Sequence, residues 1–206
     1  MLKIPKGGKI KMAIYSTLTP VEQELHGIFE SSRLHCTDNG PIYDLLVVDE
    51  DNKGIPVDNG TPLCVGEYTH EADGLQVRYA TIAKVTDQVA IAGTPALIKV
   101  AFTKAQASVT NFYNVADKPL KGYSVDDKFG LTEVFGVGLQ NFTEASQAAV
   151  KVDAYVVTDG NGKWVAQAAQ PSDTAYGFIG KIHSIAPDML ENTTTVRIAC
   201  IQNVQL

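Results

Sequence analysis

Val150-Lys-Val-Asp-Ala-Tyr-Val-Val-Thr-Asp-Gly-Asn-Gly-Lys-Trp-Val-Ala-Gln-Ala-Ala169 is the stretch that decides the fold class of this chain. In its first half, Val150, Val152, Ala154 and Val156 alternate with Lys151, Asp153 and Tyr155. This period of two predicts a half-buried strand whose core face carries the valines and the alanine. The residues Asp159-Gly-Asn-Gly162 tolerate positive φ and suit a tight turn. Lys163 to Ala166 then returns along the first strand. The stretch therefore predicts a β-hairpin.

Short apolar runs separated by turn residues continue this β pattern from Pro41 onward. We expect further strands at 42–48, 55–57, 62–65, 75–85, 89–92, 96–102, 112–115, 120–125, 176–185 and 195–201. Short strands at this spacing favour a mainly β sandwich or barrel over alternating strands and helices. Glycines punctuate the pattern near 130–144, ahead of a short helix predicted after Asn141-Phe-Thr-Glu144. We therefore expect a helix plus β-rich domain at 19–130 and a small β-barrel-like domain at 131–206.

The N-terminal region differs from the rest of the chain. Residues 1–18 contain Pro5, two glycines and four lysines, which predicts an extended basic arm that becomes ordered on contact with a partner. The residues expected to make that contact are Lys3, Lys6, Lys9, Ile10, Lys11, Met12 and Ile14. Thr19-Pro-Val-Glu22 is a capping box, so one short helix should follow. Its apolar side would carry Val21, Leu25, Ile28 and Phe29.

Charge and composition narrow the function classes. The chain has 206 residues, 45% of them hydrophobic, and a net charge of −6. Four of its 17 Lys and Arg precede the first acidic residue, Glu22, whereas all 23 Asp and Glu follow, so a basic arm precedes an acidic body. An acidic body argues against general nucleic-acid binding, and no apolar run approaches the ~20 residues that span a bilayer. Three widely spaced cysteines, Cys36, Cys64 and Cys200, predict reduced thiols.

No motif in the sequence indicates catalysis or metal binding. Asp49 to Gly54 resembles the start of a calcium loop, but position 5 is Lys53 and position 12 is Gly60, so an acidic hairpin turn is favoured. The four histidines lack ligand spacing, and no nucleophile elbow or phosphate-binding glycine loop is present. We therefore expect a non-enzyme with no catalytic residue, no cofactor and no metal.

A succession of runs resembles the capsid decoration (head auxiliary) proteins of tailed bacteriophages. The runs, in order, are 57–66, 78–84, 86–92, 111–114, 118–123, 152–157 and 177–182. The resemblance implies a β-rich, non-enzymatic virion protein that is made in the bacterial host cytoplasm. It would attach to the outer surface of the capsid, bind the major capsid protein and reinforce contacts between capsid subunits. Self-association into a homo-oligomer stays open. The basic arm has no counterpart in this resemblance.

A second class of function stays open, a carbohydrate- or receptor-binding module on a virion surface. Exposed aromatic rings would be its stacking surfaces. The sequence offers Tyr68, Tyr79, Tyr113, Tyr123, Tyr155, Trp164 and Tyr176, although most aromatic residues are expected in the core.

Overall fold

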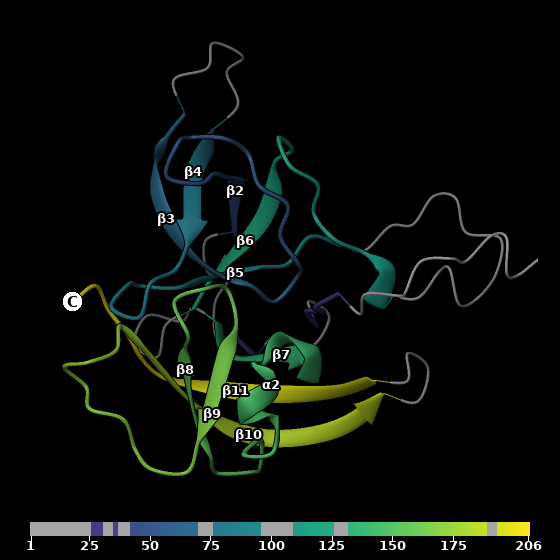
Figure 1. Cartoon of the computed structure of the whole chain (residues 1–206), viewed down its shortest axis with the longest axis vertical. Coiled ribbons are helices and arrows are strands. Elements are labelled where there is room, and N and C mark those ends of the chain that lie inside the picture. Colours follow the sequence, from purple (N-terminus) through teal and green to yellow (C-terminus); the bar gives the residue numbers. More distant parts are fainter. Residues whose placement is uncertain are drawn as a thin grey trace, which may run out of the picture.

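The computed structural model describes residues 26–30, 35–36, 42–69, 76–95, 109–125, 132–188 and 193–206. Within these residues the chain is mainly β and forms two sheets, one of which closes into a five-stranded barrel. Figure 1 shows the barrel above the six-stranded sheet, with the C-terminus at the level where they meet. The expected mainly β class is thus confirmed. The arm and the start of the expected N-terminal helix lie outside the described residues.

Five strands form the barrel. They are β2 (Ile42–Val47), β3 (Pro62–Tyr68), β4 (Val77–Ile82), β5 (Ala90–Ala92) and β6 (Leu120–Ser124). Their order is β2-β4-β3-β5-β6, and β6 closes onto β2. Only the pairing of β2 with β4 is parallel. Apolar side chains from these strands fill the interior, as expected for a small barrel: Leu45, Val47, Leu63, Ala80, Ala92 and Leu120.

The second sheet is open and antiparallel, in the order β1-β7-β11-β10-β8-β9. Its strands are β1 (His35–Cys36), β7 (Thr132–Gly138), β8 (Tyr155–Thr158), β9 (Trp164–Gln167), β10 (Phe178–Asp188) and β11 (Thr193–Asn203). The two longest strands, β10 and β11, form its centre, and their pairing is interrupted by two shifts in register. These irregularities increase the local twist of the sheet.

One hydrophobic core joins the barrel to the open sheet. Phe135, Trp164 and Phe178 from the sheet contact one another, with ring centroids 5.1–6.0 Å apart. Barrel and barrel-adjacent residues belong to the same buried cluster: Ala83, Val89, Ile91 and Val125. The indole N–H of Trp164 also donates to the Gly60 carbonyl at 2.8 Å. The two sheets therefore pack as one unit.

Three short helical elements complete the described chain. They are the 3₁₀ turns η2 (Val109–Asn111) and η3 (Leu139–Asn141), and the single-turn helix α2 (Glu144–Gln147). Helix α2 lies where the sequence predicts a short helix, and it sits beside the edge strand β9 (Figure 1).

The predicted hairpin is confirmed as the pair β8 and β9, but its first strand is shorter than predicted. Tyr155 to Thr158 pairs with Trp164 to Gln167. The expectation that the strand begins at Val150 was wrong, since the Ala154 N–H bonds the Lys151 carbonyl and Asp153 has φ +70°. This turn directs Val152 outward, where it is 55% exposed.

Two other expectations need correction. The closed barrel lies in the first half of the chain, whereas the strands after residue 131 belong to the open sheet rather than to a barrel. Ile28 and Phe29, expected at the end of a helix, are extended, because Phe29 forms a β-bridge to Val137 and the Gly138 N–H donates to the Ile28 carbonyl. The expected boundary near residue 130 and the expected strand at 96–102 fall at least in part outside the described residues.

Candidate functional site: a cleft between the barrel and the hairpin

A cleft of about 430 Å³ opens between the barrel and the β8–β9 hairpin. One wall of the cleft comes from the segment that leads into β3, and the opposite wall comes from the hairpin turn. The 109–115 segment and the start of the described chain complete the lining. The polar and aromatic residues that line it are His26, Asp58, Thr61, Tyr113, Asn161 and Lys163. Segments far apart in the sequence therefore build one concave surface.

The hairpin turn is shaped by residues that the sequence identified. Gly160 and Gly162 have φ of +78° and +92°, the left-handed backbone that glycine adopts without strain. The Asp159 carboxylate accepts hydrogen bonds from the Asn161 and Lys163 amides, at 2.7 and 2.9 Å. These contacts fix the turn, so Asn161 and Lys163 are presented from a rigid wall.

An imidazole–carboxylate pair lies on the barrel side of the cleft. His26 Nδ1 is 2.8 Å from Asp58 Oδ1, and the Gly27 amide donates to Asp58 Oδ2, also at 2.8 Å. Because a carboxylate only accepts, Nδ1 carries the hydrogen in this bond. The His26 ring in turn lies against the Tyr113 ring, with centroids 4.8 Å apart. Asp58 therefore fixes the imidazole, and the imidazole supports the tyrosine.

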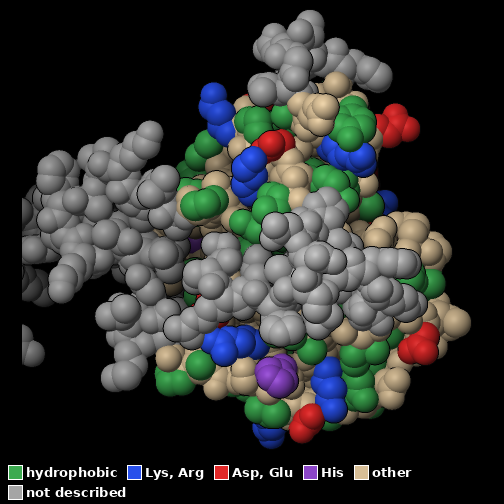
Figure 2. Space-filling view, turned by 180° about the vertical axis from the view of Figure 1, so that it is seen from behind, with side chains coloured by type: hydrophobic (Ala, Val, Ile, Leu, Met, Phe, Trp, Pro, Cys, Tyr) green, Lys and Arg blue, Asp and Glu red, His purple; other side chains and the backbone are tan. Residues whose placement is uncertain are grey.

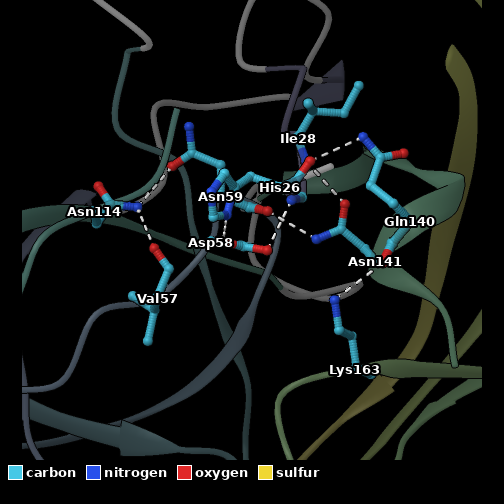
Figure 3. Close-up of polar contacts among 10 residues, drawn as sticks. His26, Ile28, Val57, Asp58, Asn59, Asn114, Gln140, Asn141 and Lys163 are labelled. Carbon is cyan, nitrogen blue, oxygen red and sulfur yellow. Dashed lines mark hydrogen bonds and ion pairs between the residues drawn. The ribbon is translucent and has the colours of Figure 1, made fainter. Parts of the chain in front are cut away.

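Buried asparagines connect the cleft to the body of the protein (Figure 3). The side-chain oxygen of Asn141 accepts from the Ile28 and Gly138 amides, and its amide donates to the Asn59 carbonyl at 2.8 Å. The Asn114 amide donates to the Val57 carbonyl and to Asn59 Oδ1. Buried polar groups are costly unless they are paired, so this network fixes the segments around it in one arrangement.

Lys163 and Gln140 tie the hairpin to the start of the described chain. The Lys163 ammonium donates to the Gln140 carbonyl at 3.0 Å, and the Gln140 side-chain amide donates to the His26 carbonyl at 3.0 Å. Figure 3 shows Lys163 reaching from the hairpin toward Gln140 and Asn141. These two hydrogen bonds therefore fix the hairpin wall of the cleft relative to the segment at His26.

The His26–Asp58 pair is an imidazole oriented by a carboxylate. A carboxylate-oriented imidazole is the base half of a hydrolytic triad, which also needs a nucleophile. The described lining residues include no serine or cysteine, and their hydroxyl groups belong to Thr61, which is buried, and to Tyr113. Cys64 lies in a separate depression, where burial and the neighbouring Asp87 carboxylate raise the pKa of its thiol. A raised pKa lowers the thiolate fraction and with it the nucleophilicity.

The structure places only part of the sequence-based site. The arm residues Lys3, Lys6, Lys9, Ile10, Lys11, Met12 and Ile14 lie outside the described residues. Asp49 to Gly54 does form the predicted turn, in which Asp49 Oδ1 accepts from the Asp51 and Lys53 amides. Sequence reasoning missed the roles of Asp58 and Asn141, because Asp58-Asn-Gly60 reads only as a turn and no local pattern marks Asn141.

No group of three or more His, Cys, Asp or Glu side chains that could hold a metal ion occurs among the described residues. No helix in the described part of the chain has the length and apolar character to cross a membrane. No protein-family model, curated protein or solved structure matches this chain.

Proposed function

We propose that this chain is a non-enzymatic structural protein of a phage virion. It binds the outer surface of the capsid shell and reinforces contacts between capsid subunits. Its partner is the major capsid protein, and its place is the capsid surface after synthesis in the host cytoplasm. Whether copies of the chain also bind one another is a separate question.

The observation that carries this proposal is the ordered succession of runs that resembles capsid decoration proteins. Those runs supply much of the scaffold. The runs 57–66 and 78–84 contain parts of β3 and β4, and 86–92 ends with β5. The run 118–123 contains most of β6, and the runs 152–157 and 177–182 contain parts of β8 and β10. The runs thus fall on strands of both sheets, and the proposed function follows from the resemblance of these runs by analogy.

The physical character of the body is compatible with reinforcement. The two sheets share one core, so a load applied at one end is transmitted through packed side chains rather than through a linker. On the face shown in Figure 2, acidic and basic side chains of the described residues are interspersed. A mixed surface of this kind favours specific pairing over attraction by a single-sign field.

Reinforcement has a thermodynamic form that can be measured. A ligand that binds the assembled shell but not its dispersed subunits stabilises assembly by RT ln(1 + [L]/Kd), which is ~2.7 kcal/mol per site at a hundredfold excess over Kd. Because a shell offers many equivalent binding sites, the small stabilisation free energies of the single sites add up to a large stabilisation of the whole shell. Particles that carry the protein should therefore withstand higher temperatures than particles without it.

The test compares shells purified with and without this chain in the same buffer. We expect a higher disruption temperature for the decorated shells, read by calorimetry and by release of the packaged genome. Mass spectrometry of the decorated particles should find this chain in copy numbers comparable with those of the main shell subunit. Equal disruption temperatures at full occupancy would exclude reinforcement, and absence of the chain from purified particles would exclude a virion role altogether.

A further inference from the structure

The cleft contains an exposed aromatic ring, that of Tyr113. Tyr113 is 43% exposed although the neighbouring His26 ring supports it from within the protein. The imidazole is in turn held by Asp58, whose second oxygen is anchored by the Gly27 amide. A ring that already packs against a neighbour loses less conformational freedom when a ligand packs against it than a free ring would, which improves affinity.

The polar groups around that ring are mixed in type and balanced in charge. Asp58 supplies one negative charge from the barrel side, and Lys163 supplies one positive charge from the hairpin. Each Asp58 oxygen accepts one hydrogen bond within the protein and has a further lone pair, while the Lys163 ammonium has three hydrogens, one of which the Gln140 carbonyl accepts. Asn161, which is exposed on the turn, offers both a donor and an acceptor.

A lining of this kind matches hydroxyl groups, because each hydroxyl both donates and accepts. A nucleotide or another polyanion would need an excess of positive charge, which this cleft lacks. A purely apolar ligand would leave Asp58 and Lys163 desolvated without new partners. The volume of about 430 Å³ falls within the ~300–1,000 Å³ typical of small-molecule sites.

From these features we propose that the cleft binds a neutral saccharide of one or two rings. The apolar face of a pyranose packs on Tyr113, and its hydroxyls bond Asp58, Asn161 and Lys163. This binding function is independent of attachment to a capsid. A protein that fails to decorate shells can still bind the sugar, and a protein that decorates shells can fail to bind it.

Binding is tested by titrating the isotope-labelled full-length protein with neutral sugars and following its amide resonances. The panel is D-glucose, D-galactose, D-mannose, N-acetyl-D-glucosamine and lactose, with D-glucuronate and ATP as charged comparisons. We expect at least one neutral sugar to shift the amides of Asn161 and Gly162 in a saturable manner. The proposal is overturned if no sugar of the panel does so, or if glucuronate or ATP binds more tightly than every neutral sugar.

Two substitutions locate the binding. Tyr113→Ala should weaken the affinity for the sugar that binds by about tenfold, and Asn161→Ala by several-fold. Tyr68→Ala is the matched control, because Tyr68 is 51% exposed but does not line the cleft. It should change the affinity less than twofold. Both cleft residues are in exposed positions, so thermal unfolding should confirm that the variants are folded. Unchanged affinity in folded Tyr113→Ala would refute the assignment of the site.

Discussion

Gly136 on β7 shows how a single residue determines a long-range contact. The Glu30 amide donates to the Gly136 carbonyl, and Gly136 pairs with Arg197 on the neighbouring strand β11. Because Gly136 has no side chain, the Glu30 carboxylate reaches across β7 and comes within 3.6 Å of the Arg197 guanidinium nitrogen Nε. A Cβ atom at position 136 would lie 2.8 Å from Glu30 Oε2 and 3.1 Å from Thr195 Cγ2. A side chain at position 136 would therefore force the Glu30 carboxylate to move.

Gly136→Ala should lower the free energy of unfolding by about 1–2 kcal/mol, because the methyl group displaces a partly buried carboxylate from its partner. Urea unfolding of the single and double variants measures this cost. In a Glu30→Ala background, the same substitution should cost less than half as much, since the main obstacle is gone. An equal cost in both backgrounds would show that the carboxylate is not what the methyl group meets.

At the scale of elements, the end of β11 is fastened to the barrel by one side chain. Asn203 is 5% exposed, and its oxygen accepts from the Val89 amide at 2.7 Å. Its side-chain amide donates to the Val89 carbonyl at 2.8 Å and to the Val125 carbonyl at 2.5 Å. The Asn203 carboxamide thus bonds both backbone groups of Val89, just before β5, as a neighbouring strand would. It also bonds the carbonyl of Val125, the residue that follows β6. An open-sheet strand and the barrel are joined through this contact.

Asn203→Ala should destabilise the protein by roughly 2–3 kcal/mol, because three buried backbone groups lose their partner. The matched control is Asn161→Ala on the exposed hairpin turn, which should stay within about 0.5 kcal/mol of the wild type. Denaturant unfolding measures both. Hydrogen exchange at the Val89 amide should accelerate in Asn203→Ala and not in the control.

Asn203→Asp gives this prediction a pH-dependent form. An ionised carboxylate accepts but cannot donate, so near pH 7 it would face two carbonyl oxygens without a hydrogen. Relative to the wild type at the same pH, the variant should be less destabilised at pH 4, where the acid form can donate to one carbonyl. A loss that is the same at both pH values would contradict the donor role of the Asn203 amide.

At the scale of the whole molecule, the chain combines one packed body with a basic N-terminal segment. Four lysines precede Glu22, and every acidic residue follows them. The segment lies outside the described residues, so its contribution to capsid binding is predicted from its composition. We expect the alternating Ile10, Met12 and Ile14 to supply apolar contacts or strand pairing, and the lysines to supply electrostatic attraction.

Deleting residues 1–15 should therefore weaken binding to the capsid shell severely. Replacing Lys3, Lys6, Lys9 and Lys11 by Gln should weaken it modestly, since each exposed charge pair contributes only ~0.2–1 kcal/mol, and should flatten its salt dependence. Cosedimentation with shells at several salt concentrations measures both effects. If the deleted protein binds as tightly as the full chain, attachment must lie in the β body.

Local patterns determined much of this protein by themselves. The mainly β class, the Asp159-Gly-Asn-Gly162 turn and the short helix at Glu144 follow from backbone preferences and side-chain contacts within a few residues. The same reasoning failed at Val152, where a turn at Asp153 replaces the expected strand. It also failed at Phe29, where pairing with β7 replaces the expected end of the helix, while the start of that helix lies outside the described residues.

Tertiary structure alone decided the rest. Period-two alternation reports that a strand has two faces but does not name its neighbour, so the parallel pairing of β2 with β4 and the closure of the barrel left no local signal. The polar contacts of the cleft, and those between the barrel and the open sheet, join residues that are distant in the sequence. Examples are Asp58 with His26 and Trp164 with Gly60. Their stabilisation exists only when the partner is already in place, because an unpaired polar group in the interior costs free energy.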